Sequence, residues 1–219
     1  MARNIKISVD EYYHVYNRGN GKREIFHDEA DYVRFQVLLY FSNNIKGIHV
    51  ADYKSQSVKE LYDLSREETL VDIGAYCLMP NHLHLLIKEK IEGGTSLFMQ
   101  KLSTAYTMYY NKKYNNTGSL FGGRFKAKHL DSDQYLKYQY SYIHLNPVSI
   151  IDSGWKNKKI TDIKKAKIFL SSYNYSSYKD YLSEKRKEGT IINKESFPDY
   201  FSNSTKFSEM ISEWMGFSN

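Results

Sequence analysis

The sequence lacks several features that mark particular environments or ligands. It has one cysteine, Cys77, among 219 residues, so no disulfide can form within the chain. It has no run of about 18 apolar residues, the minimum for a membrane-spanning helix. The first residues also lack the apolar stretch of a signal peptide. We therefore expect a cytoplasmic protein with no membrane partner. Neither a Walker motif nor a CxxC pair is present, so a phosphate-binding loop and a structural zinc site are not indicated.

Basic residues and tyrosine are the two abundant features. The formal net charge is +6, and there are 21 tyrosines against 2 tryptophans. A positive charge favours polyanionic partners, and tyrosine can stack on exposed bases. Many basic proteins bind no nucleic acid, however, and most of these tyrosines fit half-buried packing positions equally well. Composition therefore leaves nucleic-acid binding open.

Alternation and helical spacing divide the first 146 residues into seven elements. In chain order these are a strand at 11–19, a helix at 28–44, strands at 70–79 and 82–90, a helix at 96–114, a short basic strand ending at 130 and a helix at 131–146. Asp28 is the expected N-cap of the first helix, and Thr95 or Ser96 that of the second. The third helix is expected to be capped near Asp131 or Ser132.

This order of elements predicts an α+β fold. A βαββαβ sequence is the ferredoxin-like arrangement, an antiparallel sheet with helices on one face. We assign residues 1–150 to this domain. Residues 151–219 are richer in lysine and aromatic residues, and we expect a C-terminal helical appendage packed on the same domain. The lysine run that begins at Lys156 is interpreted as a solvated surface, with DNA affinity as a secondary role.

Two histidines stand on alternate positions of the second hairpin strand. His82 and His84 share one face of that strand, while Leu83 points to the other. Imidazoles roughly 7 Å apart in Cα position can converge on one divalent metal. Such pairs also arise as half-buried polar residues, and alone the pattern favours that interpretation. His14 on the first strand is expected to be a hydrogen-bonded polar residue that would reach the same place only from a central strand.

A tyrosine and an asparagine supply what the histidine pair lacks. Tyr142 and Asn146 are four residues apart, so they lie one above the other on the last helix. The amide oxygen of Asn146 suits Mg²⁺ or Mn²⁺ as a third ligand, and Tyr142 could attack a phosphodiester beside that ion. Tyr138 is the rival nucleophile, but the residue four positions beyond it is Tyr142, a poor metal ligand.

These motifs resemble those of a known family. The stretch "MPNHLHLLIK" resembles the histidine-hydrophobe-histidine (HUH) motif of single-tyrosine transposases, and "YIHLNPV" resembles their nucleophile helix. The most similar group is the REP-associated tyrosine transposases of the IS200-like family. The segments "YHVYNRGNGKREIF", "GSLFGGRFKAKHL" and "SSYKDYL" resemble that group too.

The resemblance implies a ferredoxin-like nuclease and strand transferase that uses Mg²⁺ or Mn²⁺ on single-stranded DNA. It makes His82 and His84 metal ligands, Tyr142 the nucleophile and Asn146 the third ligand, a position where the insertion-sequence branch often has Gln. The product would be a 5′-phosphotyrosine with a free 3′-OH, near hairpin-forming repeats. The family also implies a bacterial, nucleoid-associated protein. Some relatives share active sites between subunits, so a homodimer is an open expectation.

Five further residues are candidate DNA contacts. Two lie at the turn after the first strand and three alternate along the fourth: Asn17, Arg18, Arg124, Lys126 and Lys128. They could track phosphates or form a solvated face. Two other functions stay open, a non-catalytic protein that binds single-stranded nucleic acid, and a metal-dependent hydrolase in which water attacks instead of the tyrosine.

Overall fold

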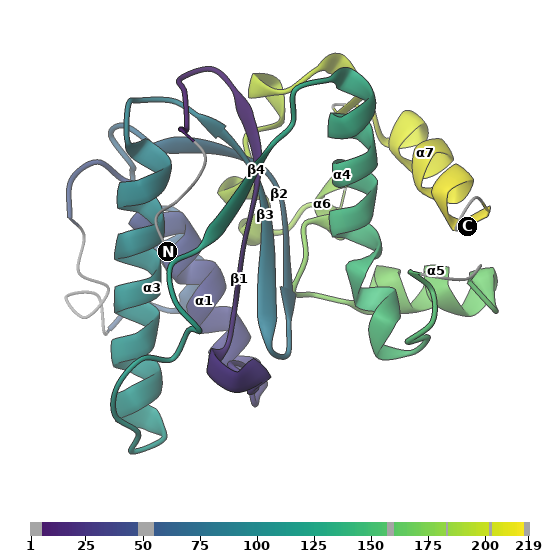
Figure 1. Ribbon diagram of the computed structural model, residues 1–219. Helices are drawn as coiled ribbons and strands as arrows, with labels where there is room; N and C mark the ends of the chain where they lie inside the picture. Colours follow the sequence, from purple (N-terminus) through teal and green to yellow (C-terminus); the bar gives the residue numbers. More distant parts are fainter. Residues whose placement is uncertain (1–5, 48–54, 157–159, 183, 202, 217–219) are drawn as a thin grey trace.

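A four-stranded sheet forms the centre of the molecule. The computed structural model describes residues 6–47, 55–156, 160–182, 184–201 and 203–216. Neighbouring strands are antiparallel and lie in the order β2-β3-β1-β4 (Figure 1). The strands are β1 (Tyr12–Arg18), β2 (Val71–Met79), β3 (His82–Glu89) and β4 (Lys126–His129). The predicted α+β class and ferredoxin-like strand order are confirmed, and β1 is a central strand.

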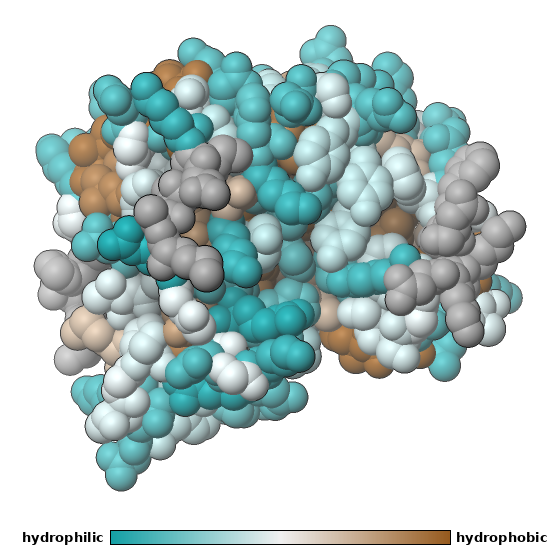
Figure 2. All heavy atoms as spheres, in the orientation of Figure 1, coloured by the Kyte–Doolittle hydropathy of each residue, from teal (hydrophilic) through white to brown (hydrophobic). Residues whose placement is uncertain are grey.

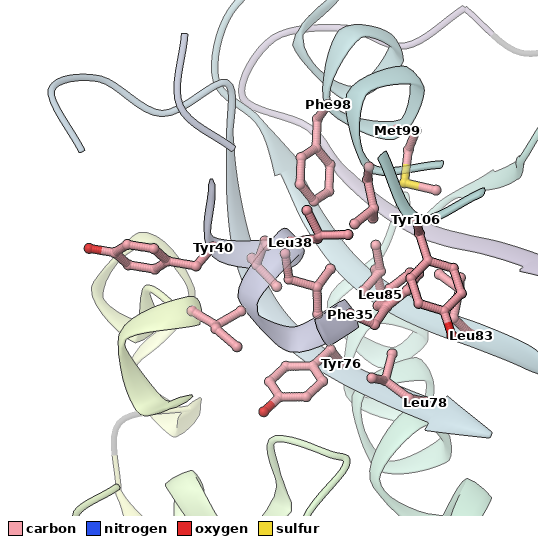
Figure 3. Packing of buried hydrophobic residues seen from close by; sticks show 14 of the residues in the cluster. Phe35, Leu38, Tyr40, Tyr76, Leu78, Leu83, Leu85, Phe98, Met99 and Tyr106 are labelled. Carbon is pink, nitrogen blue, oxygen red and sulfur yellow. The ribbon is translucent and has the colours of Figure 1, made fainter. Parts of the chain in front are cut away.

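Two long helices cover one face of this sheet. α1 (Glu29–Ser42) follows β1, α3 (Gly94–Lys113) follows β3, and both lie on the same side in Figure 1. Figure 3 shows Leu83 and Leu85 of β3 pointing into the core that these helices close. Both leucines are buried, as the alternation of β3 predicts. The helices of the βαββαβ unit therefore lie on one face, as predicted.

The other face is covered by the helix that follows this unit and by the C-terminal segment. Figure 1 shows α4 (Asp133–Leu145), α5 (Ile163–Ser172) and α7 (Ser204–Gly216) on the side of the sheet opposite α1 and α3. A second apolar cluster joins this side of β2 to these helices and to α6 (Tyr178–Tyr181). An apolar core therefore lies on each face of the sheet. The domain boundary at residue 150 stays a prediction.

Short helices complete the described chain. They are η1 (Asn20–Lys22), α2 (Val58–Leu61), η3 (Asn146–Ile150), η4 (Lys187–Ile191), η5 (Lys194–Ser196) and η6 (Asp199–Phe201). No helix in the described ranges is long and apolar enough to cross a membrane.

Helix caps were predicted correctly at two of three helices. Asp28 accepts a hydrogen bond from the backbone N–H of Asp31, and Ser132 accepts one from Tyr135. The prediction for α3 was wrong, because this helix begins at Gly94 after Gly93 in the left-handed region. The buried carboxylate of Glu89 accepts from both the backbone and the hydroxyl of Thr95 instead. A side chain from β3 thus satisfies the first turn of α3.

A glycine in β2 lets the C-terminal segment approach the sheet. Gly74 lies at an irregularity in the β2–β3 register, and a Cβ there would lie 2.6 Å from the ring of Phe197. We expect Gly74→Ala to lower the free energy of unfolding by about 2 kcal/mol, because the ring must move. Urea unfolding measures this. Gly47→Ala is the matched control, since nothing lies within 4 Å of its added Cβ. Equal stability of the two variants would contradict the close packing described here.

Candidate functional site

A cavity of about 670 Å³ lies between the sheet and α4. Eight of the nine predicted site residues line it: Asn17, Arg18, His82, His84, Arg124, Lys126, Lys128 and Tyr142. Figure 2 shows hydrophilic residues gathered along the middle of this face, between the α3 side and the α4 side. The ninth residue, Asn146, is fully buried one helical turn beyond Tyr142. The structure therefore brings residues from β1, β3, the β4 region and α4 to one place.

Tyr142 faces the histidines of the sheet. Its ring centroid is 5.6 Å from that of His84 and 6.3 Å from that of His14, and it meets both rings nearly edge-on. Because α4 packs across β2 and β3, a residue sixty positions after the histidines reaches them. Tyr138, the rival nucleophile, lines the same cavity one turn earlier and stacks against Tyr142 at 6.1 Å.

One nitrogen of each predicted histidine ligand is held by a neighbour. Nδ1 of His82 lies 2.5 Å from the side-chain oxygen of Asn81. Nδ1 of His84 lies 2.8 Å from Nε2 of His14, with which it shares a hydrogen bond. Nε2 of His84 is buried and has no hydrogen-bond partner in the described part of the chain. A nitrogen left open in this way beside a cavity suits a metal ligand whose ring is oriented from behind.

Burial keeps these imidazoles neutral. Desolvation lowers the pKa of His82 to about 4, helped by the positive charges of Arg18 and Lys156 and opposed by a hydrogen bond to the side chain of Asn146. Burial of the ring also holds the pKa of His84 well below its ordinary value. Burial also lowers the pKa of His14 to about 3. The rings are therefore uncharged at neutral pH, and the neutral imidazole is the form that binds metals.

Asn146 and Tyr142 are joined by a lysine. The Asn146 side-chain N–H donates to the Tyr142 carbonyl at 3.2 Å, while its oxygen accepts from Nζ of Lys156 at 3.1 Å. The same Nζ donates to the phenolic oxygen of Tyr142 at 2.9 Å. Lys156 is thus part of the site, whereas its sequence context indicated a solvated surface.

The donor set fits a divalent cation. In the described ranges no three His, Cys, Asp or Glu side chains are grouped to hold a metal. A centre here would therefore use the imidazoles of His82 and His84 together with the amide oxygen of Asn146. The rings are perpendicular with centroids 5.0 Å apart, and the open Nε2 of His84 is the observation that supports a ligand there. The amide oxygen is the donor of this set that suits Mg²⁺ or Mn²⁺, and three protein ligands would leave positions for substrate.

The basic wall of the cavity is built from the ends of strands. Arg18 ends β1, Lys126 and Lys128 lie on β4, and Arg124 precedes that strand. Asn17 has a structural part as well, since its side-chain N–H donates to the carbonyl of Gly123 at 3.2 Å. Four of the five residues predicted to contact DNA therefore bring positive charge to the cavity. Contact of these residues with DNA stays a prediction.

Sequence reasoning missed two residues that complete the site. His14 was expected to be a satisfied polar residue, and its partner proves to be His84 itself. Lys156 follows Trp155, a buried aromatic residue within a lysine-rich stretch. A tryptophan within a lysine-rich stretch is a signal in the sequence that could have placed this segment on the core. Gln139 also lines the cavity, and its side-chain nitrogen has no partner among the described residues.

Fold and site together define an α+β protein that presents paired imidazoles to a tyrosine on a packing helix. The model of the family described as "Transposase IS200 like" matches residues 8–146, more than half of the chain. The chain belongs to this family, which confirms the resemblance seen in its motifs. It is therefore a protein of the transposase class, whose members process DNA.

A solved structure supports the fold. The structure of a REP-associated tyrosine transposase bound to a REP hairpin is similar to this chain with a TM-score of 0.50 and 12% sequence identity. The similarity covers 86% of this chain and 89% of the other. Among curated proteins, none matches the chain.

Proposed function

We propose that this chain nicks and rejoins single-stranded DNA through Tyr142, at or near hairpin-forming repeats. The observation that carries the proposal is the approach of the Tyr142 ring to His84, 5.6 Å between centroids, in a cavity lined by arginine and lysine. The similar solved transposase is bound to a REP hairpin, and we extend that class of DNA to this chain.

In this proposal Tyr142 attacks a backbone phosphorus of the bound strand. The bond from its phenolic oxygen to phosphorus forms while the bond from phosphorus to the 3′-oxygen breaks. The tyrosine proton passes through solvent to that leaving oxygen, so the products are a 5′-phosphotyrosine and a 3′-OH. His82, His84 and Asn146 would hold Mg²⁺ or Mn²⁺, which when bound polarises the phosphate and stabilises its charge. Arg18, Arg124, Lys126 and Lys128 hold the strand by its phosphates.

The decisive experiment is a search for the covalent adduct. The purified protein is incubated with hairpin-containing single-stranded DNA from its own genomic flanks, in Mn²⁺, and digested for mass spectrometry. We expect a nucleotide linked to the peptide that contains Tyr142. DNA binding without an adduct would favour the non-catalytic binding protein, and cleavage without an adduct would favour the hydrolase that uses water. The homodimer and the nucleoid location stay predictions.

His14 is expected to control metal affinity without binding the metal. If Nδ1 of His84 donates to Nε2 of His14, the lone pair of His84 is fixed on the open Nε2. Loss of such an outer partner typically weakens metal binding by about 10–100-fold. Isothermal titration of His14→Ala with Mn²⁺ should show that loss. His129→Ala is the control, because His129 lies on the same sheet but pairs with Glu11. Unchanged Mn²⁺ affinity in His14→Ala would rule out this role.

A further inference from the structure

Lys156 places its ammonium group between two residues of the proposed chemistry. Nζ is 2.9 Å from the phenolic oxygen of Tyr142 and 3.1 Å from the side-chain oxygen of Asn146. It also lies 4.9 Å from the centre of the Tyr142 ring. Several arginine and lysine side chains line the cavity. Among the residues that the structure describes, Lys156 is the basic residue whose side chain donates a hydrogen bond to Tyr142.

The backbone before Lys156 is held in place. After η3, the backbone N–H of Asp152 donates to the carbonyl of Val148 at 2.8 Å. The side chain of Asp152 then accepts from the backbone N–H groups of Gly154 at 3.3 Å and Thr161 at 3.0 Å. Trp155 is buried in the second core, with its ring 6.1 Å from that of Tyr142. A buried tryptophan therefore anchors the residue next to the lysine, although the lysine itself is exposed.

We propose that Lys156 is a further catalytic residue, which holds the phenolic oxygen of Tyr142 and stabilises the negative charge on it during attack. This inference rests on the proposed function. As the phenol gives up its proton, charge develops on an oxygen that already accepts a hydrogen bond from a cation. Lys156 keeps its own protons throughout, so it takes no part in the balance of the reaction. A pre-placed donor at developing charge is an effective form of transition-state stabilisation.

The same hydrogen bond also affects which rotamer the Tyr142 side chain adopts. The phenol of Tyr142 lies next to several aromatic rings, and the hydrogen bond from Nζ favours the orientation that places its oxygen beside Lys156. Asn146 accepts from the same ammonium, so the helix that carries the nucleophile and the segment after it are tied at one point. Removal of the ammonium therefore affects the attacking oxygen directly.

Single-turnover adduct formation at saturating hairpin DNA tests the inference. We expect Lys156→Met and Lys156→Gln to form the Tyr142 adduct about a hundredfold more slowly than wild type, the loss typical of one transition-state donor. Lys156→Arg should keep part of the rate. Lys164→Met is the control for lost positive charge, since Lys164 is exposed on α5 and does not line the cavity. Thermal unfolding checks that all variants are folded.

DNA affinity and chemical rescue separate catalysis from binding. We expect fluorescence anisotropy to show hairpin affinities within about threefold of wild type, since one phosphate contact at most is lost. Ethylammonium added to Lys156→Ala should restore part of the rate. If the Lys156 variants form the adduct at the wild-type rate at saturating DNA, or if weaker DNA binding fully explains their defect, the proposed role of Lys156 is wrong. The proposed function would still stand in that case, because the wild-type protein forms the adduct. Absence of the wild-type adduct would overturn both.

Discussion

Tyr142→Phe is expected to form no covalent adduct with DNA. The variant lacks the phenolic oxygen that accepts a hydrogen bond from Lys156, while the ring beside His84 and its packing stay in place. We expect a rate at least about a thousandfold below wild type, because no other group supplies the attacking oxygen. Hairpin affinity should stay near that of wild type. Denaturing gel electrophoresis of labelled DNA measures the adduct, and anisotropy measures the affinity.

Tyr138→Phe is the informative comparison. Tyr138 is on the same helix face and lines the same cavity, but it lies one turn farther from Asn146. It should therefore keep adduct formation at a rate near that of wild type. If Tyr138→Phe loses the adduct and Tyr142→Phe retains it, the nucleophile is Tyr138 and the proposed ligand set must be reassigned.

His84→Ala should lose both Mn²⁺ binding and adduct formation. His84 is at the centre of the site, with Nδ1 on His14, its ring against Tyr142 and Nε2 open. A bound cation contributes several kcal/mol of charge stabilisation, so we expect the adduct rate to fall by about a thousandfold. Titration with Mn²⁺ reports binding independently of DNA.

The control for this variant is again His129→Ala, which removes an imidazole from β4 at the position paired with Glu11. It should bind Mn²⁺ as wild type does. An adduct rate for His84→Ala that matches wild type would mean that the metal, if used, is held elsewhere. Wild-type Mn²⁺ binding with a lost adduct would instead indicate that His84 acts on the tyrosine alone.

The sequence alone was sufficient to predict the strands of the sheet and to select the residues proposed for the centre of the site. The alternation in "HLHL" indicates which side of β3 faces the core under α1 and α3, and the ends of β1 and α1 were placed within a few residues. The spacing of Tyr142 and Asn146 placed both on one face of a helix. These features are local, so the periods of strand and helix determine them.

Residues that depend on tertiary packing could not be placed in the same way. The role of Glu89 at the start of α3 depends on how β3 approaches that helix, which no local pattern records. The partner of His14 depends on which strands are neighbours. Lys156 enters the site only because Trp155 is buried in the second core, so the lysine-rich composition of the segment was misleading.

The antiparallel pairing of β1 with β3 makes strand register a condition for the proposed activity. Tyr16 pairs with His84 and Arg18 with His82, so the residues of β1 and β3 that face the cavity are fixed by one hydrogen-bond ladder. A shift of β3 by one residue against β1 would exchange the two faces of β3 and direct leucines toward the cavity. A chain altered in this way could still collapse around its apolar residues, yet it would have lost both imidazoles from the site. Selection for the proposed activity is therefore expected to preserve the length of the β2–β3 hairpin more strictly than the identity of its apolar side chains.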